Sequence, residues 1–270
     1  MTNETLTARR DRTWVFAISM VAILAIVNWL HEILARFQTY RGLYKDHAFY
    51  VSESIDKLGG VALCAVAVWT LRSRSWKGVA CELGLNLSPF PGLAFGFLAS
   101  LPMLVGFAWT RGVTPHMQSL SVIFLTVFSP IVEEVEFRGF GTRALQRGTR
   151  WPFWLIVWPQ VLLFGIGHIE KGQHFAEKAG LFLLTGSGAV VLGWLVHRWQ
   201  NLWFPIGLHI FLNLWWELFS VSKTAIGGWF PFALQTGSML AAIAITLCVS
   251  RRRGSAETGC QISAPAARGK

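Results

Sequence analysis

Four charged residues stand within six positions of the sequence, directly after a long uncharged stretch. The segment from 121 to 141 reads SVIFLTVFSPIVEEVEFRGFG, and its charged residues are Glu133, Glu134, Glu136 and Arg138. An ionised side chain inside a membrane helix costs about 2.5 to 3.5 kcal/mol on the insertion scale, so such residues are rare and mark active sites or transport paths. The cluster therefore indicates a polar site, unless it is simply the wet end of a membrane span.

Helical spacing separates the roles of these residues. Positions four apart share one face of an α-helix, so Glu134 and Arg138 can neutralise each other and act as a structural pair. Glu133 lacks that partner and is the candidate general base that activates a water molecule. Glu136 lies about 60° around the helix from Glu133, where it either tunes the base or faces water.

Two histidines and an asparagine occur later in apolar segments. Phe164 and His168 are four residues apart in LLFGIGHIEKG, although a lone histidine at a helix end is more often a satisfied polar residue. His209 and Asn213 share a helix face about 6 Å apart along the axis in NLWFPIGLHIFLNLWWELF. Both could donate hydrogen bonds to the oxyanion that forms when a peptide carbonyl is attacked. The alternative is a pair that only holds two helices together.

The composition places these residues in a membrane. The chain has 270 residues, 53% of them hydrophobic and only 14% charged, with 14 Trp. These values exclude an ordinary soluble domain and predict an all-α polytopic membrane protein with an intramembrane polar cavity. We expect about eight spans, at residues 14–35, 57–71, 91–109, 119–138, 153–169, 179–197, 202–220 and 232–250.

The formal net charge of +10 predicts topology rather than nucleic-acid binding, because the basic residues are scattered over loops and tails. With these spans, the excess of Lys and Arg in alternate loops places both termini in the cytoplasm. Residues 1–12 are predicted to be a cytoplasmic segment, 13–250 a single membrane domain, and 251–270 a disordered basic tail. The sequence does not indicate an oligomeric state.

Three short motifs resemble those of the CAAX-protease and bacteriocin-processing family of glutamic-type intramembrane endopeptidases. They are EEVEFRG at 133–139, FGIGH at 164–168 and HIFLN at 209–213, within a family-like core of about residues 80–220. The resemblance implies that Glu133 activates water, His168 positions it, and His209 with Asn213 binds the oxyanion. Glu134, Arg138 and Phe164 would support the site. Glu136 departs from the family pattern, which usually has an apolar or aromatic residue there.

The sequence therefore predicts an intramembrane endopeptidase that cleaves a membrane-associated or lipidated protein, without a metal or other cofactor, in a prokaryotic inner membrane. Three alternatives remain. A zinc protease could use the same His and Glu residues, although no HExxH occurs. A non-enzymatic peptide-binding or bacteriocin-immunity protein could use the polar cluster to hold a peptide or its own helices. An ion or proton transporter could use the buried carboxylates as a relay.

Overall fold

The described part of the chain is helical, as the sequence predicted. The computed structural model describes residues 3–46, 49–113, 119–221 and 227–252, and no strand occurs in these ranges. The long helices are α1 (Asn3–Asn28), α4 (Phe49–Leu71), α11 (Phe153–His168), α12 (Phe175–Trp199), α13 (Trp203–Leu218) and α14 (Trp229–Arg252). Shorter ones are α2 (Leu30–Leu34), α3 (Gln38–Asp46), α5 (Trp76–Leu83), α6 (Phe90–Ala99), α7 (Leu101–Thr110) and the one-turn η3 (Ile169–Lys171). The predicted tail, beyond the end of α14 at Arg252, lies outside the described residues.

Five described helices are long and apolar enough to cross a membrane, or six if the bent pair α6 and α7 forms one span. The five are Asp11–Asn28, Tyr50–Leu71, Phe153–Lys171, Phe175–Trp199 and Trp229–Val249. Ser100 and Pro102 interrupt the pair, which bends by 46°. The predicted count of eight is therefore not confirmed. The two segments that fail this test are the fourth and the seventh, which carry the carboxylate cluster and the pair His209 and Asn213.

The fourth segment is an unbroken helical run that changes its winding four times. It consists of α8 (Ser119–Ile123), η1 (Phe124–Phe128), α9 (Ser129–Glu133), η2 (Glu134–Ala144) and α10 (Leu145–Thr149). Both η1 and η2 are π-helical, a rare winding that is frequent at functional sites. The run continues well past the predicted end at residue 138, and all of η2 is buried. The carboxylates are therefore not at a wet helix end.

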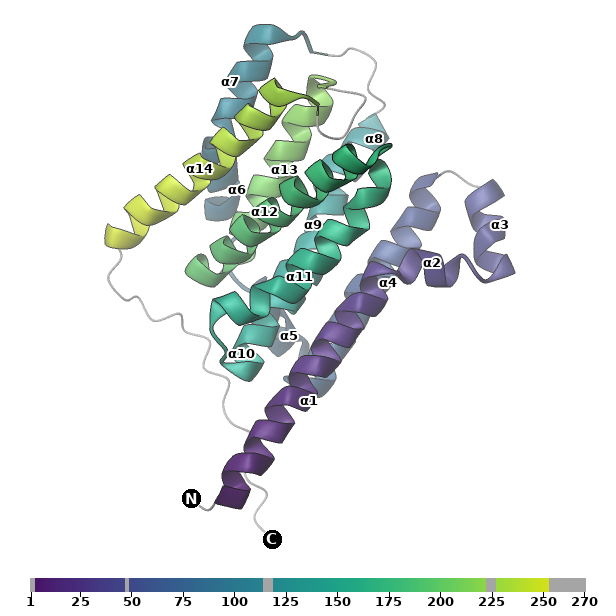
Figure 1. Cartoon of the computed structure of the whole chain (residues 1–270), viewed down its shortest axis with the longest axis vertical. Helices are drawn as coiled ribbons and strands as arrows, with labels where there is room; N and C mark the ends of the chain where they lie inside the picture. The colour runs from purple at the N-terminus through teal and green to yellow at the C-terminus, as the bar shows by residue number, and fades with distance from the viewer. Residues whose placement is uncertain (1–2, 47–48, 114–118, 222–226, 253–270) are drawn as a thin grey trace.

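Small residues set the closest helix contact. Gly96 of α6 lies against the backbone of Gly207 in α13, and a Cβ on Gly96 would collide with that backbone. The same approach brings Gly92 against Gly207 and Trp203. This contact seats α13 in one apolar core with α6, α7 and α14, while a second core joins α1, α4, η2 and α11. In Figure 1, α14, α12, α11 and α1 follow one another across the bundle.

A buried charge network fixes the far end of η2. Arg143, 4% exposed, donates hydrogen bonds to the carbonyl oxygens of Cys81 and Glu82 at the end of α5. The fully buried carboxylate of Glu82 pairs with Arg72 at 3.4 Å and with Arg147 at 3.2 Å. Arg143 and Arg147 therefore bind the end of α5 to the fourth segment.

Candidate active site

The centre of the site is a fully buried ion pair. Glu134 Oε1 lies 3.1 Å from Arg138 Nη1, and both side chains are 0% exposed. The separation is that of an ion pair, but its angles are not those of a hydrogen bond. The guanidinium instead lies over the ring of Phe164, with Cζ 4.5 Å from the ring centroid, so a cation–π contact from α11 completes its surroundings. The predicted pairing of Glu134 with Arg138 is thus present, and Phe164 supports it.

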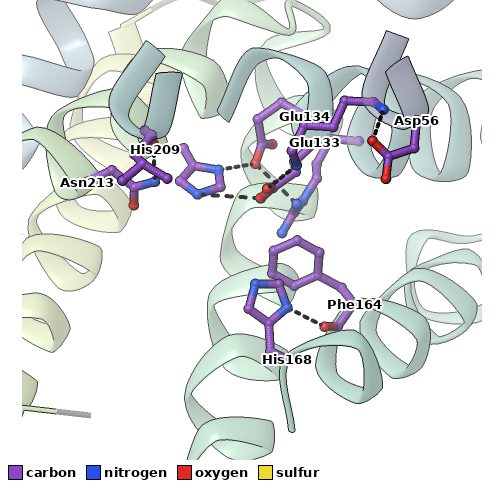
Figure 2. A network of polar contacts seen from close by, with 10 residues as sticks. Asp56, Glu133, Glu134, Phe164, His168, His209 and Asn213 are labelled. Carbon is purple, nitrogen blue, oxygen red and sulfur yellow. Dashed lines mark hydrogen bonds and ion pairs between the residues drawn. The ribbon is translucent and has the colours of Figure 1, made fainter. Parts of the chain in front are cut away.

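His209, which lies on α13, faces the adjacent carboxylates of Glu133 and Glu134. Its Nδ1 lies 2.8 Å from Glu134 Oε1, and its Nε2 lies 4.0 Å from Glu133 Oε2. Figure 2 shows the imidazole directed at both carboxylates. An ionised carboxylate only accepts hydrogen bonds, so Nδ1 donates to Glu134 and Nε2 is the atom that faces Glu133.

Glu133 has a cationic partner that the sequence reasoning missed. Lys57 Nζ donates to Glu133 Oε1 at 3.2 Å, and the two side chains are 20% and 21% exposed. Helical spacing indicates only that Glu133 lacks Arg138 as a partner, and it identifies no other cation for this carboxylate. Spacing along one helix cannot reveal this pair, because Lys57 comes from α4, 76 residues earlier.

The position of α4 explains the omission. The second span was predicted to begin at residue 57, but α4 begins at Phe49 and its apolar stretch at Tyr50. Glu53, Asp56 and Lys57 therefore lie inside a candidate membrane helix. An intramembrane lysine is the signal that would have marked this residue.

His168 reaches the site from the end of α11. Its Nδ1 lies 2.8 Å from the carbonyl oxygen of Phe164, and its ring is tilted over that of Phe164 with centroids 4.4 Å apart. A carbonyl only accepts, so Nδ1 carries the proton and Nε2 is left as an acceptor. Glu133 and His168 line one cavity of about 310 Å³, together with Lys57, Asp56 and Glu136. Both side chains therefore border the same space.

Asn213 lies one turn beyond His209 on α13, as predicted, but its amide is partly engaged. Its Nδ2 donates to the carbonyl oxygen of Leu125 in the π-helical η1 at 3.1 Å. This bond holds α13 against the fourth segment, which is the helix-holding alternative considered for Asn213. The second hydrogen on Nδ2 makes no bond within the described part of the chain.

Glu136 lies in the same cavity as Glu133 but has different surroundings. Its side chain is 7% exposed, and it forms no hydrogen bond or ion pair with any described residue. Gly60 of α4 provides the space for its carboxylate, because a Cβ on Gly60 would collide with Glu136 Oε1. The alternative in which Glu136 simply faces bulk water does not fit this degree of burial.

One group of described side chains could hold a metal ion. His31, Glu53 and Asp56 offer ligand atoms that all lie within 4.8 Å of one another. His31 Nδ1 already lies 2.9 Å from Asp56 Oδ2, and the Tyr40 hydroxyl donates to the same oxygen at 3.2 Å. The residues of the zinc alternative, Glu133, Glu134, His168 and His209, do not form such a group.

The fold and the site together define a class: a polytopic, helical membrane protein with carboxylates and histidines gathered at a partly open, polar cavity. Residues 115–215 match the family described as type II CAAX prenyl endopeptidase Rce1-like. The match places this segment in the CAAX-protease family that the three motifs predicted, and it indicates a membrane endopeptidase with a protein substrate. The matched segment contains Glu133, His168, His209 and Asn213, but not Lys57. A comparison with curated proteins found no match.

Proposed function

We propose that this protein hydrolyses a peptide bond of a membrane-associated protein with a water molecule that Glu133 activates. The observation that carries the proposal is the shared cavity of Glu133 and His168, with His209 Nε2 4.0 Å from the same carboxylate. Glu133 has the exposure and the position to contact a water molecule, whereas Glu134 is enclosed by Arg138 and His209. The proposed location is a prokaryotic inner membrane with both termini in the cytoplasm.

The chemistry balances with the groups present. Glu133 takes a proton from water while the water oxygen bonds to the peptide carbonyl carbon, and His168 Nε2 accepts a hydrogen bond from the O–H that this oxygen keeps. The oxyanion accepts hydrogen bonds from Asn213 and from His209, which must be doubly protonated to donate from Nε2 because Nδ1 already donates to Glu134. When the C–N bond breaks, Glu133 returns its proton to the leaving amine. Lys57 holds the carboxylate toward the cavity.

The test compares the purified full chain with its Glu133→Gln variant. Each is incubated with a defined mixture of synthetic peptides in lipid nanodiscs, and new termini are read by mass spectrometry. A Glu217→Gln variant is the matched control, since it loses one carboxylate of α13 outside the cavity. We expect the wild type and the control to cut the peptides and Glu133→Gln to leave them intact. Equal cutting by folded Glu133→Gln would refute the mechanism, and no cutting by any protein would favour the non-enzymatic binder.

A further inference from the structure

The cavity beside Glu133 is acidic, although the whole chain is strongly basic. The sequence has 24 Lys and Arg against 14 Asp and Glu. The cavity lining reverses that balance, with five carboxylates against two lysines: Glu32, Glu53, Asp56, Glu133, Glu136, Lys57 and Lys171. Charged residues spread over the surface of a basic protein do not explain an excess of carboxylates over lysines in this one cavity. A concave acidic site instead attracts a cationic group.

Glu136 is the most buried carboxylate of this cavity that forms no hydrogen bond or ion pair with a described residue; Glu32 and Glu53 also form none, but both are more exposed. Glu133 has Lys57, Glu134 has Arg138 and His209, and Asp56 has His31 and Tyr40. Glu136 makes no hydrogen bond or ion-pair contact in the described ranges, although it is 93% buried, and the nearby charge of Lys57 is already paired with Glu133. Burying a carboxylate without a partner is costly, because it loses its hydrogen bonds to water. Gly60 nevertheless leaves room for this carboxylate at the cavity wall.

We propose that the cavity is a subsite for a basic side chain of the substrate, and that Glu136 binds its ammonium or guanidinium group. This inference rests on the proposed peptidase function, which it deepens by naming a substrate class. An ammonium or guanidinium group next to Glu136 would form a charge-assisted hydrogen bond with its carboxylate. Because Glu133 lines the same cavity, the basic residue would stand close to the bond that is cut. Ten of the fifteen lining residues are polar or charged, so the cavity suits a charged side chain better than an isoprenoid chain.

The first experiment measures binding and does not depend on cleavage. The thermal unfolding midpoint of the detergent-purified full chain is followed by Trp fluorescence, with N-acetylarginine amide or N-acetylcitrulline amide added. The two probes have nearly the same shape, but only arginine carries a charge. We expect arginine to raise the midpoint of the wild type and of Glu217→Gln, with an apparent affinity about tenfold above that of citrulline.

Two variants locate the effect. Glu136→Gln removes the charge, while Gly60→Ala keeps the charge and displaces the carboxylate, because the new Cβ would occupy the position of Glu136 Oε1. We expect both to lose the difference between the two probes, and either one suffices if the other does not fold. Equal effects of the two probes on the wild type, or a difference that persists in these variants, would overturn the inference.

The second experiment separates this inference from the proposed function. In the peptide mixture, we expect wild-type cut sites to be enriched about tenfold in Lys or Arg near the cut bond, and Glu136→Gln to cut without that enrichment. Cleavage that requires Glu133 but shows no basic preference would refute the subsite alone. Cleavage that persists in Glu133→Gln would refute the proposed mechanism and leave the binding result to decide the subsite.

Discussion

Replacing Arg138 by Met should destabilise the protein more than any change at an exposed arginine. Arg138 Nη1 and Glu134 Oε1 are 3.1 Å apart, and both side chains are 0% exposed. At an effective dielectric constant of about 20, two unit charges at this separation attract by about 5 kcal/mol. Desolvation offsets part of that attraction in the intact pair. Removing one partner leaves the other buried and unpaired, which typically costs about 3 to 5 kcal/mol.

The double variant Glu134→Gln/Arg138→Met tests whether this cost is electrostatic. It removes both charges, and the amide oxygen of the introduced glutamine would still accept the hydrogen bond from His209 Nδ1. We therefore expect it to recover about 2 kcal/mol or more of the loss in Arg138→Met. The assay is unfolding of the detergent-solubilised chain by SDS, followed by circular dichroism. Arg111→Met, which changes an exposed arginine, is the matched control and should match the wild type.

Two results would refute this reasoning. If Arg138→Met unfolds within about 1 kcal/mol of the wild type, the buried pair is not under the electrostatic constraint that its burial implies. If the double variant is no more stable than the single one, the loss comes from the contact between Arg138 and the Phe164 ring rather than from an unpaired carboxylate.

Three further predictions concern Lys57, Gly96 and His168. Lys57→Met should lower kcat about tenfold, a loss of about 1.4 kcal/mol in transition-state stabilisation, and Lys57→Arg should recover most of that loss. Steady-state cleavage rates measure both effects. Equal rates for the wild type and the two variants would contradict a positioning role of Lys57. Gly96→Ala should lower the free energy of unfolding by about 1 to 3 kcal/mol, because the new Cβ would collide with the backbone of Gly207. Gly112→Ala is the control, since a Cβ on Gly112 would have no atom within 4 Å. Equal SDS unfolding midpoints for the two variants would contradict the close contact. His168→Ala should lower kcat at least about 100-fold with an unchanged unfolding midpoint, and a cleavage rate near that of the wild type would exclude it from the chemistry.

Local spacing predicted the parts of the site that lie on one helix. Glu134 and Arg138 are four residues apart, and so are Phe164 and His168, and both pairs are in contact in the structure. These contacts follow from the helical repeat, so they need no knowledge of the tertiary fold. The all-helical class followed equally directly from the long apolar stretches.

Contacts between helices were not predictable in the same way. The pairing of Lys57 with Glu133 depends on how α4 packs against the fourth segment, and the bond from Asn213 to Leu125 depends on the register of α13. The π-helical winding of η2 also leaves no periodic signal in the apolar pattern, which was interpreted as an α-helical span ending at residue 138. The boundary of α4 was misplaced because charged residues were assumed to lie outside the membrane.

The three carboxylates of the fourth segment differ in what each would lose by taking up a proton. If Glu134 were protonated, Arg138 would remain as a buried cation without its counter-charge, which is a costly state. If Glu133 were protonated, the Lys57 side chain, which is 20% exposed, could turn toward the other carboxylates of the cavity. Protonation of Glu136 would leave no cation without its ion-pair partner among the described residues. Glu136 also makes no hydrogen bond or ion pair with His168 or His209 in that part of the chain. Protonation of Glu133 would therefore break only its ion pair with Lys57 and leave the buried pair of Glu134 and Arg138 intact, which agrees with the proposed role of Glu133 as the general base.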